Sequence, residues 1–293
     1  MIELHRTATV RTLRYRGTIQ RYWDFEADRR APVRPPLFMV HGFRGDHHGL
    51  LRIVEALPGH RVITPDLPGF GQSEPLPGNH DVEAYAEFVL SSVSALGLGP
   101  ETVLVGHSFG SIIAGHAAAD APGRFSALVL INPISAPALE GSSRIATRLA
   151  ELYYRLGAVL PENAGQLLLR NRVIVRAMSE LMAKTRNRDL RRWIHGQHRA
   201  YFSAFASRDV VLQAFTASIS GTVRDSAPRL SLPVLLIAAE KDDLGSIATQ
   251  QALAGLIPDS KLAVIEDVGH LIHYETPDIA ARTITQFLED IAT

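Results

Sequence analysis

Five consecutive residues constrain the fold of this chain more than any other feature: Gly106-His107-Ser108-Phe109-Gly110. An apolar run at 102–105 precedes them, and a run of small and apolar residues at 111–119 follows. A buried strand, a sharp G-x-S-x-G turn and then a helix are the context of a nucleophile elbow. Such a turn strains the backbone at the serine and leaves little room two residues before and after it, where both residues are glycine. The motif predicts a serine hydroxyl held above a sheet at the N-terminus of a helix.

Two later apolar runs end in residues that suit a serine nucleophile. The strand-like run 234–238 leads into Glu240-Lys241-Asp242-Asp243, and the run 262–265 leads to Gly269-His270. The order Ser, Asp, His differs from the orders of chymotrypsin and subtilisin. In this interpretation His270 takes the proton of Ser108, and Asp242 fixes the imidazole tautomer. Asp243 is the alternative acid, while Glu240 is expected to be a surface or supporting group.

A third apolar run supplies a candidate oxyanion hole. Residues 37–40 end in His41-Gly42-Phe43-Arg44-Gly45. An oxyanion hole of this kind needs one backbone N–H from the residue after the nucleophile and one from the loop after the third strand. The N–H groups of Phe109 and Phe43 are the candidates.

On these motifs, together with Asp66-Leu67-Pro68-Gly69-Phe70-Gly71-Gln72-Ser73, the chain resembles the α/β-hydrolase family over nearly its whole length. The resemblance implies an eight-stranded, mostly parallel sheet flanked by helices, a helical cap after the sixth strand, and Ser-His-Asp chemistry without a cofactor. The acid loop departs from the family, with Ala239 where glycine is frequent and Asp243 where proline is common. Some members place the acid after the sixth strand, but Asn132 stands there in this chain, so the later loop keeps the role.

The alternation of strand-like and helix-like runs fits one α/β domain with an insertion. A chain of 293 residues with 46% hydrophobic content is long enough for such a core. We predict a core domain of residues 1–133 and 230–293 and a helical cap at 134–229, because the strand-like runs stop there. Within the cap, helices are expected at 145–159, 164–184 and 189–205. Tyr153, Tyr154, Trp193, Tyr201 and Phe202 are spaced either to line a substrate pocket or to form an ordinary packed stripe.

Composition excludes several classes of function. The formal net charge is zero, which argues against a nucleic-acid partner, and the absence of cysteine excludes disulfides and thiolate catalysis. No apolar run approaches the ~20 residues of a membrane span, and the first residues lack the apolar region of a signal peptide. We therefore expect a cytoplasmic protein with a small-molecule substrate and no membrane partner. Asp46-His47-His48 with His41 matches no familiar ligand spacing, so no metal is expected.

Charge is distributed unevenly between the two predicted domains. Residues 134–229 hold 15 Lys and Arg against 7 Asp and Glu, which leaves 15 against 23 for the rest, or about +8 and −8. One interpretation is that the arginines cover exposed helix faces and pair with acids of the core. The other is that some of them attract an anionic substrate.

The leading functional hypothesis is hydrolysis of a carboxylic ester through an acyl-enzyme on Ser108. A serine nucleophile argues against the dehalogenase and epoxide-hydrolase relatives, which use aspartate. The alternative is carbon–carbon bond hydrolysis of the meta-cleavage-product type, although those enzymes usually carry tryptophan after the histidine, where this chain has Leu271. A non-catalytic binding protein and transfer to an acceptor other than water are further alternatives. His107 is expected to be structural, and His273 is expected to be either a structural residue or a residue at the rim of the site.

Overall fold

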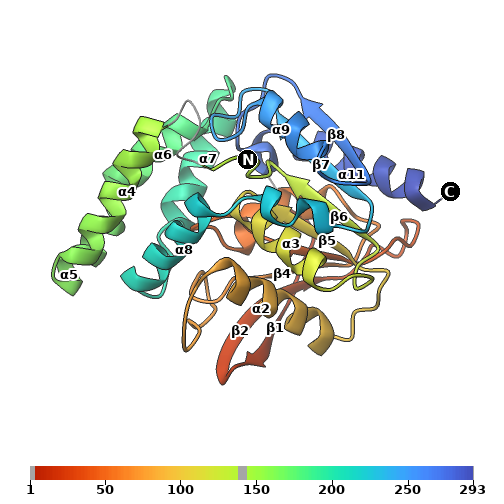
Figure 1. Ribbon diagram of the computed structural model, residues 1–293, viewed down its shortest axis with the longest axis horizontal. Helices are drawn as coiled ribbons and strands as arrows, with labels where there is room; N and C mark the ends of the chain where they lie inside the picture. The colour runs from red at the N-terminus through yellow and green to blue at the C-terminus, as the bar shows by residue number, and fades with distance from the viewer. Residues whose placement is uncertain (1–3, 138–143, 293) are drawn as a thin grey trace.

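Among the residues that the structure describes, eight strands form a single sheet with the order β1-β2-β4-β3-β5-β6-β7-β8. The computed structural model describes residues 4–137 and 144–292 of the chain, without the side chains of 144–147 (Figure 1). β1 and β2 pair antiparallel, β2 pairs antiparallel with β4, and all other neighbours are parallel. The predicted mostly parallel sheet is confirmed. The strands are β1 (Thr9–Tyr15), β2 (Thr18–Phe25), β3 (Leu37–Val40), β4 (Val62–Pro65), β5 (Val103–His107), β6 (Ala127–Ile131), β7 (Val234–Ala239) and β8 (Ser260–Ile265).

Helices cover both faces of this sheet (Figure 1). The main helices are α1 (Leu51–Glu55), α2 (Val82–Ala95), α3 (Phe109–Asp120), α4 (Arg144–Val159), α5 (Glu162–Leu169), α6 (Arg172–Met182), α7 (Arg188–Tyr201), α8 (Arg208–Ser220), α9 (Ile247–Ala254), α10 (Ile272–Glu275) and α11 (Pro277–Ala292). Three short 3-10 turns are η1 (His47–Leu50), η2 (Val223–Asp225) and η3 (Ala227–Arg229).

Alternate residues of the central strands enter two separate hydrophobic cores. In β3, Phe38 packs in the core that contains α2 and α3, whereas Met39 packs in the core that contains α1 and α11. This follows from the two-residue period of a strand, because successive side chains leave opposite faces of the sheet. Both faces are buried, so the central strands are continuously apolar, as the sequence runs indicated.

Residues 134–229, between β6 and β7, contain helices α4–α8 and no strand among those that the structure describes. We call these residues the helical segment and the remainder the sheet core. The single helix expected at 164–184 is wrong: α5 ends at Leu169 and α6 begins at Arg172. Asn171 separates them, because its side chain accepts hydrogen bonds from the N–H groups of Val173 and Ile174 and caps the new helix.

The helix expected at 189–205 is also shorter than predicted, since α7 ends at Tyr201. Two hydrogen bonds to a loop of the sheet core hold the residues after it, from Gly71 N–H to Ala204 O at 2.8 Å and from Ala206 N–H to Gly69 O at 2.8 Å. These bonds require extended backbone, which a helix cannot supply. Helix α8, which follows directly, was not predicted from the sequence.

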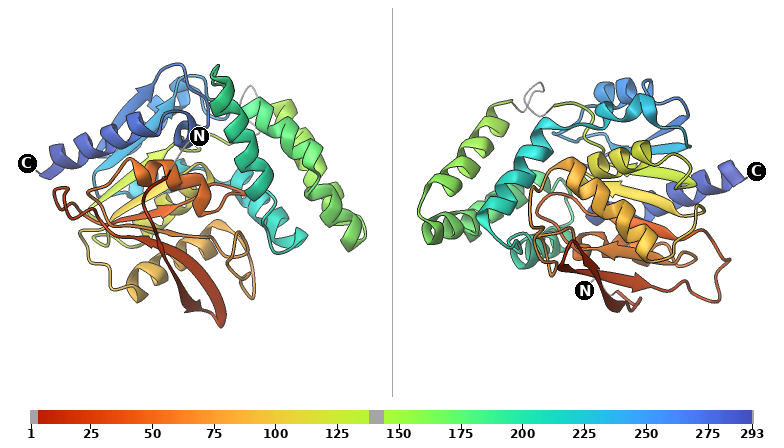
Figure 2. Two further views of the ribbon diagram at one scale, coloured as in Figure 1. Left: turned by 180° about the vertical axis from the view of Figure 1, so that it is seen from behind. Right: turned by 60° about the horizontal axis from the view of Figure 1, so that its bottom comes forward.

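The helical segment lies beside the carboxyl ends of the parallel strands, with α4 at the outer edge of the molecule in all three views (Figures 1 and 2). A stack of four rings joins the sheet core to α7. Trp23 stacks on His47 with ring centroids 3.3 Å apart, His47 lies 3.8 Å from His48, and His48 stacks on Tyr201 at 3.7 Å. On the same helix, Trp193 meets Tyr274 edge-on at 5.3 Å.

Across residues 4–137 and 144–292, no helix has the length and apolar character needed to cross a bilayer.

Candidate active site

Ser108 stands between β5 and α3 in a strained backbone conformation with a positive φ, at φ 54° and ψ −121°. The glycines on either side make this turn possible. A Cβ on Gly106 would lie 2.3 Å from the carbonyl oxygen of Gly110, and a Cβ on Gly110 would lie 2.4 Å from that of Val40. No other residue fits at either position, because both distances are well inside van der Waals contact. The predicted elbow geometry is therefore present.

His270 and Asp242 meet Ser108 from the ends of two other strands. His270 Nε2 lies 2.8 Å from Ser108 Oγ, and His270 Nδ1 lies 2.8 Å from Asp242 Oδ2. The side chains of His270 and Asp242 are only 6% and 2% exposed. A serine hydroxyl, an imidazole and a buried carboxylate in this order can remove the serine proton and stabilise the resulting imidazolium.

The surroundings of Asp242 keep its carboxyl group ionised. Burial by itself raises the pKa of Asp242, but His270, the Leu244 N–H and the Asn132 amide more than compensate, so that the pKa lies below its usual value. Leu244 N–H donates to Oδ1 at 2.9 Å, and Asn132 Nδ2 donates to Oδ2 at 2.9 Å. Both oxygens of the carboxylate are thus held by donors.

The hydrogen bond from Asn132 to Asp242 was not predicted from the sequence. There, Asn132 was used only to exclude an acid at that position. Asn132 directly follows β6 and has a positive φ of 46°. Its backbone N–H donates to Ile237 O at 2.8 Å, which ties the end of β6 to β7. The residue type was the sequence signal for this role, because asparagine is one of the few residues that tolerate a positive φ. It stands at the end of β6, beside β7, the strand that leads to Asp242.

Of the two neighbouring aspartates, Asp242 and not Asp243 receives His270. The carboxylate of Asp243 forms an ion pair with Lys184 of the helical segment at 2.6 Å, and its side chain is 56% exposed. Glu240 accepts a hydrogen bond from the N–H of Asp267 at 2.9 Å, within the loop after β8. These contacts place both residues outside the chain of hydrogen bonds that reaches Ser108.

The two predicted oxyanion residues lie beside Ser108. A Cβ on Gly42 would be 3.2 Å from the Cβ of Ser108, so the loop after β3 runs directly against the serine. Phe43 follows in this loop, and its ring lies 6.5 Å from that of Phe109. Phe109 opens α3, where helical geometry leaves its N–H without an intrahelical acceptor.

His41 supports the same loop from beneath. Its Nε2 accepts a hydrogen bond from Leu67 N–H at 2.9 Å, and its Nδ1 lies 2.8 Å from Gly42 O. Because Nε2 accepts, the ring is the neutral tautomer that donates from Nδ1. Burial lowers the pKa of His41, in agreement with this neutral form.

Arg44 fastens the oxyanion loop to the helical segment, a connection that the sequence did not reveal. The residue is only 1% exposed, and its guanidinium donates to Phe202 O at 2.9 Å, Tyr154 Oη at 3.1 Å and Leu169 O at 2.7 Å. All three acceptors are neutral groups of the helical segment. The ring of Tyr154 also meets that of Phe43 at 5.7 Å, so an apolar wall from the helical segment covers the loop.

Three further buried histidines extend from the site into the helical segment. The rings of His107 and His273 are 4.1 Å apart, and His107 lies 5.6 Å from His270. Burial lowers the pKa of His107 to about 3 and that of His198 on α7 to about 4, and it lowers the pKa of His273 as well. All three rings are neutral near neutral pH. His273 is buried, so the alternative that placed it at the rim is wrong.

Asp46, His47 and His48 bring potential metal ligand atoms within 4.8 Å of one another. Several of these atoms already have hydrogen-bond partners. Asp46 Oδ1 accepts from the N–H of His48, and His47 Nδ1 lies 2.9 Å from Asp66 Oδ1. Both histidine rings also belong to the four-ring stack. We therefore interpret this cluster as a support of the fold and propose no metal site there.

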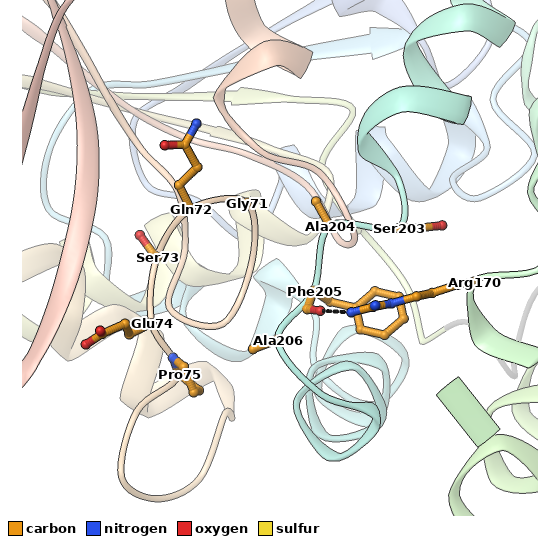
Figure 3. A pocket seen from close by; sticks show the side chains of 10 residues that line it. All are labelled: Gly71, Gln72, Ser73, Glu74, Pro75, Arg170, Ser203, Ala204, Phe205 and Ala206. Atoms are coloured by element: carbon orange, nitrogen blue, oxygen red, sulfur yellow. Dashed lines mark hydrogen bonds between the residues drawn. The ribbon is translucent and has the colours of Figure 1, made fainter. Parts of the chain in front are cut away.

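A hollow of about 500 Å³ opens where the loop after β4 meets the helical segment (Figure 3). Arg170 spans one side, donating from Nη2 to Phe205 O at 2.7 Å. None of Ser108, Asp242 and His270 is among its lining residues, which are Gly71, Gln72, Ser73, Glu74, Pro75, Arg170, Ser203, Ala204, Phe205 and Ala206.

Comparison with known proteins supports a relation over most of the chain. The sequence model of the α/β hydrolase fold matches residues 35–277. The chain is 25% identical to Lipase 3 of Moraxella sp. strain TA144 over 259 residues, which is 87% of this chain and 78% of that protein. It is 26% identical to Lipase 1 of Psychrobacter immobilis over 258 residues, 86% of this chain and 76% of that protein. Among solved structures, a thermophilic esterase from Thermogutta terrifontis superposes with a TM-score of 0.74 at 26% identity, covering 99% of this chain and all of that one.

Proposed function

This chain belongs to the α/β-hydrolase family and is a hydrolase, and from that premise we propose that it cleaves carboxylic esters of small or medium acyl groups through an acyl-enzyme on Ser108. The observation that carries the proposal is the pair of 2.8 Å contacts that join Ser108 to His270 and His270 to Asp242. The relatives named as lipases and an esterase support an ester as the bond that is cleaved.

In the proposed first step, His270 Nε2 takes the proton of Ser108, and Ser108 Oγ adds to the ester carbonyl carbon. The oxyanion that forms accepts hydrogen bonds from the N–H groups of Phe43 and Phe109. Asp242 stabilises the imidazolium without taking its proton. His270 then donates the proton to the alcohol oxygen as the carbon–oxygen bond breaks, leaving an acyl group on Ser108.

In the second step, His270 removes a proton from water, and the hydroxide adds to the acyl carbon. Collapse of this intermediate breaks the bond to Ser108 Oγ, which recovers its proton from His270. The acid product leaves, and the site returns to its starting state with no cofactor consumed.

The surroundings of the oxyanion loop favour an apolar acyl group. The ring of Phe43 lies 5.8 Å from Phe215 and 5.7 Å from Tyr154, both of the helical segment. Tyr154 and Phe215 stack at 4.0 Å. These rings and Phe109 cluster around Phe43, and in this proposal they provide the apolar surroundings of the acyl group.

A panel of p-nitrophenyl esters of graded acyl length, with one meta-cleavage-type diketone included, tests the proposal. We expect turnover of the shorter esters, a burst of p-nitrophenol on rapid mixing, and a mass increase of one acyl group on the peptide that contains Ser108. Cleavage of the diketone without turnover of any ester would favour carbon–carbon hydrolysis. Binding of esters without release of product would favour a non-catalytic member of the family.

A further inference from the structure

Large apolar side chains are exposed on the outer face of the helical segment far more than elsewhere. Seventeen large hydrophobic residues are exposed in the part of the chain that the structure describes, and eight of them lie between Leu149 and Leu181. The other nine are scattered along the sheet core. Isolated exposed leucines are ordinary on a protein surface. A cluster of exposed apolar residues within about 30 residues of chain instead indicates an interaction surface.

The exposed residues of α4 fall on one stripe. Leu149, Leu152, Leu156 and Val159 recur at spacings of three and four residues and are 62%, 54%, 48% and 85% exposed. The opposite side of the helix carries the buried Tyr154. α4 therefore has two apolar faces, of which only the inner one is covered by the described residues.

Helices α5 and α6, which follow α4 in the chain, also expose large apolar side chains. Leu167 on α5 is 74% exposed, and Val173 and Leu181 on α6 are 77% and 63% exposed. The inner side of α6 is occupied by Val175 and Ser179, which are buried. We call the exposed apolar residues of α4, α5 and α6 the outer apolar face; the helices that bear it form the edge of the molecule in Figures 1 and 2.

Arginines border the outer apolar face. Arg148 and Arg155 directly precede Leu149 and Leu156, so they follow one edge of the stripe on α4. Arg155 pairs with Glu151 at 2.6 Å, whereas no ion pair joins Arg148 or Arg172 to another described residue. From Arg148 to Leu181 the chain has five arginines and three glutamates, a net charge of about +2.

We propose that the outer apolar face of α4–α6 docks on the surface of an anionic lipid bilayer. The leucines and valines would enter the boundary between headgroups and acyl chains, while the bordering arginines keep their guanidinium groups at the level of the phosphates. The positive border complements an anionic leaflet. A second copy of the chain related by two-fold symmetry would instead set the same net positive face against itself.

This proposal differs from the expectation that the protein has no membrane partner. That expectation rested on the lack of an apolar run long enough to cross a bilayer, but a helix that lies on the surface needs only an apolar face with a basic border. The site of hydrolysis takes no part in the docking, so the proposal can be tested separately from the proposed function.

Flotation of the purified full chain with lipid vesicles is the test. We expect it to bind vesicles of phosphatidylcholine with about 30% phosphatidylglycerol far better than pure phosphatidylcholine, with binding that weakens as salt is added. The triple variant Leu149→Ser, Leu156→Ser, Val173→Ser should lose at least about tenfold in partition coefficient. Arg148→Gln with Arg172→Gln should lose about fivefold for each arginine.

Matched variants on the sheet core serve as controls. Val33→Ser, Leu256→Ser and Ile291→Ser remove three other exposed apolar side chains, and Arg29→Gln with Arg30→Gln remove two other exposed arginines. The triple apolar control and the double arginine control should each bind vesicles as well as the unaltered chain does. Thermal unfolding should show that every variant is folded. The proposal is overturned if the unaltered chain stays in solution or if the control variants lose as much binding as the others. It is also overturned if light scattering shows a lipid-free dimer that the triple variant dissociates, because the face then binds a second copy.

Discussion

The sheet core and the helical segment hold their polar groups in very different ways. In the core, the site residues stand at strand ends, where backbone geometry leaves almost no alternative, as at Ser108 between its two glycines. In the helical segment, most of the recorded ion pairs of Lys and Arg are internal, such as Arg155–Glu151 and Arg176–Glu180. The backbone of the core therefore fixes the site of the proposed reaction, whereas the exposed faces of the segment lie apart from that site.

The two regions share one hydrophobic core, and a set of polar contacts also ties them together. The polar contacts include the Arg44 guanidinium, the backbone hydrogen bonds that join residues 69–71 to 204–206, and the ion pair of Lys184 with Asp243. Of the interpretation that these arginines cover exposed helix faces and pair with core acids, the first part agrees with the structure, whereas most of their ion pairs among the described residues are with acids of the segment itself. Lys184–Asp243 and Arg229–Asp120 are ion pairs that do cross the boundary.

The sharpest test of the core as the seat of the chemistry is Ser108→Ala. We expect a loss of turnover on the order of 10⁶ with the fold intact, because no other nucleophile stands at the elbow. Ester turnover and far-UV circular dichroism measure the two properties. Substantial residual turnover by a folded variant would move the nucleophile elsewhere.

The next largest effect distinguishes the two neighbouring aspartates. Asp242 is buried beside His270, whereas Asp243 is exposed and paired with Lys184. Asp242→Asn should lower kcat by roughly 10⁴, because the amide favours the wrong tautomer of His270. Asp243→Asn removes the exposed ion pair with Lys184 across the boundary and should change kcat little. Steady-state kinetics on one ester compare the two variants, and the reverse ranking would assign the acid to Asp243.

A third test concerns the connection between the regions. Arg44→Met should lower the free energy of unfolding by about 3 kcal/mol, since it removes the donor to Phe202 O and Tyr154 Oη, while Leu169 O keeps a hydrogen bond from Tyr153 Oη. Urea denaturation measures the loss. The matched variant Arg155→Met, on the exposed side of α4, should lose under about 0.5 kcal/mol. Equal losses would show that Arg44 does not fasten the segment.

The smallest effect is a dependence of stability on pH. His107 and His198 have pKa values lowered by burial to about 3 and about 4, whereas an unfolded histidine titrates near 6.5. Their contribution is complete above pH ~6.5 and is lost as the pH falls toward those values, at about 1.4 kcal/mol per pH unit for each ring. His198→Gln, in the helical segment, should flatten the slope of urea stability between about pH 6.5 and 5 by one proton.

The core variant His273→Asn provides the comparison for that measurement. The pKa of His273 is also lowered by burial, so this variant should flatten the same slope. If the two regions unfold together, both variants act on one transition. An unchanged slope in either variant would mean that its histidine is not kept neutral in the folded protein.

The site of the core was largely predictable from the sequence because each of its residues has a local signal. Glycine spacing marks the elbow at Ser108, and an apolar run that ends in a polar residue marks Asp242 and His270. The sheet follows from the same runs. Asn132 and Arg44 were not predictable in their roles, since each acts through a partner more than 100 residues away in the chain.

The helical segment was predictable as helices but not in its boundaries or its faces. The break at Asn171 depends on whether one asparagine caps a new helix or remains inside an old one, and both are compatible with the local pattern. The end of α7 is set by hydrogen bonds to residues 69–71, which no periodicity reveals. Apolar residues three and four positions apart on α4 are compatible with a buried stripe or an exposed stripe. The fold shows that α4 has one of each.

The two tryptophans of this chain divide between the two regions, so that each region carries its own optical reporter. Trp23 of β2 stacks on His47, while Trp193 of α7 meets Tyr274 and lies under the guanidinium of Arg52. Fluorescence of a chain that retains only Trp193 follows the departure of α7 from the core, and a chain that retains only Trp23 follows the β1–β2 hairpin against η1. Coincident denaturation curves would identify a single cooperative unit, and an earlier curve for Trp193 would identify a helical segment that opens while the sheet remains folded.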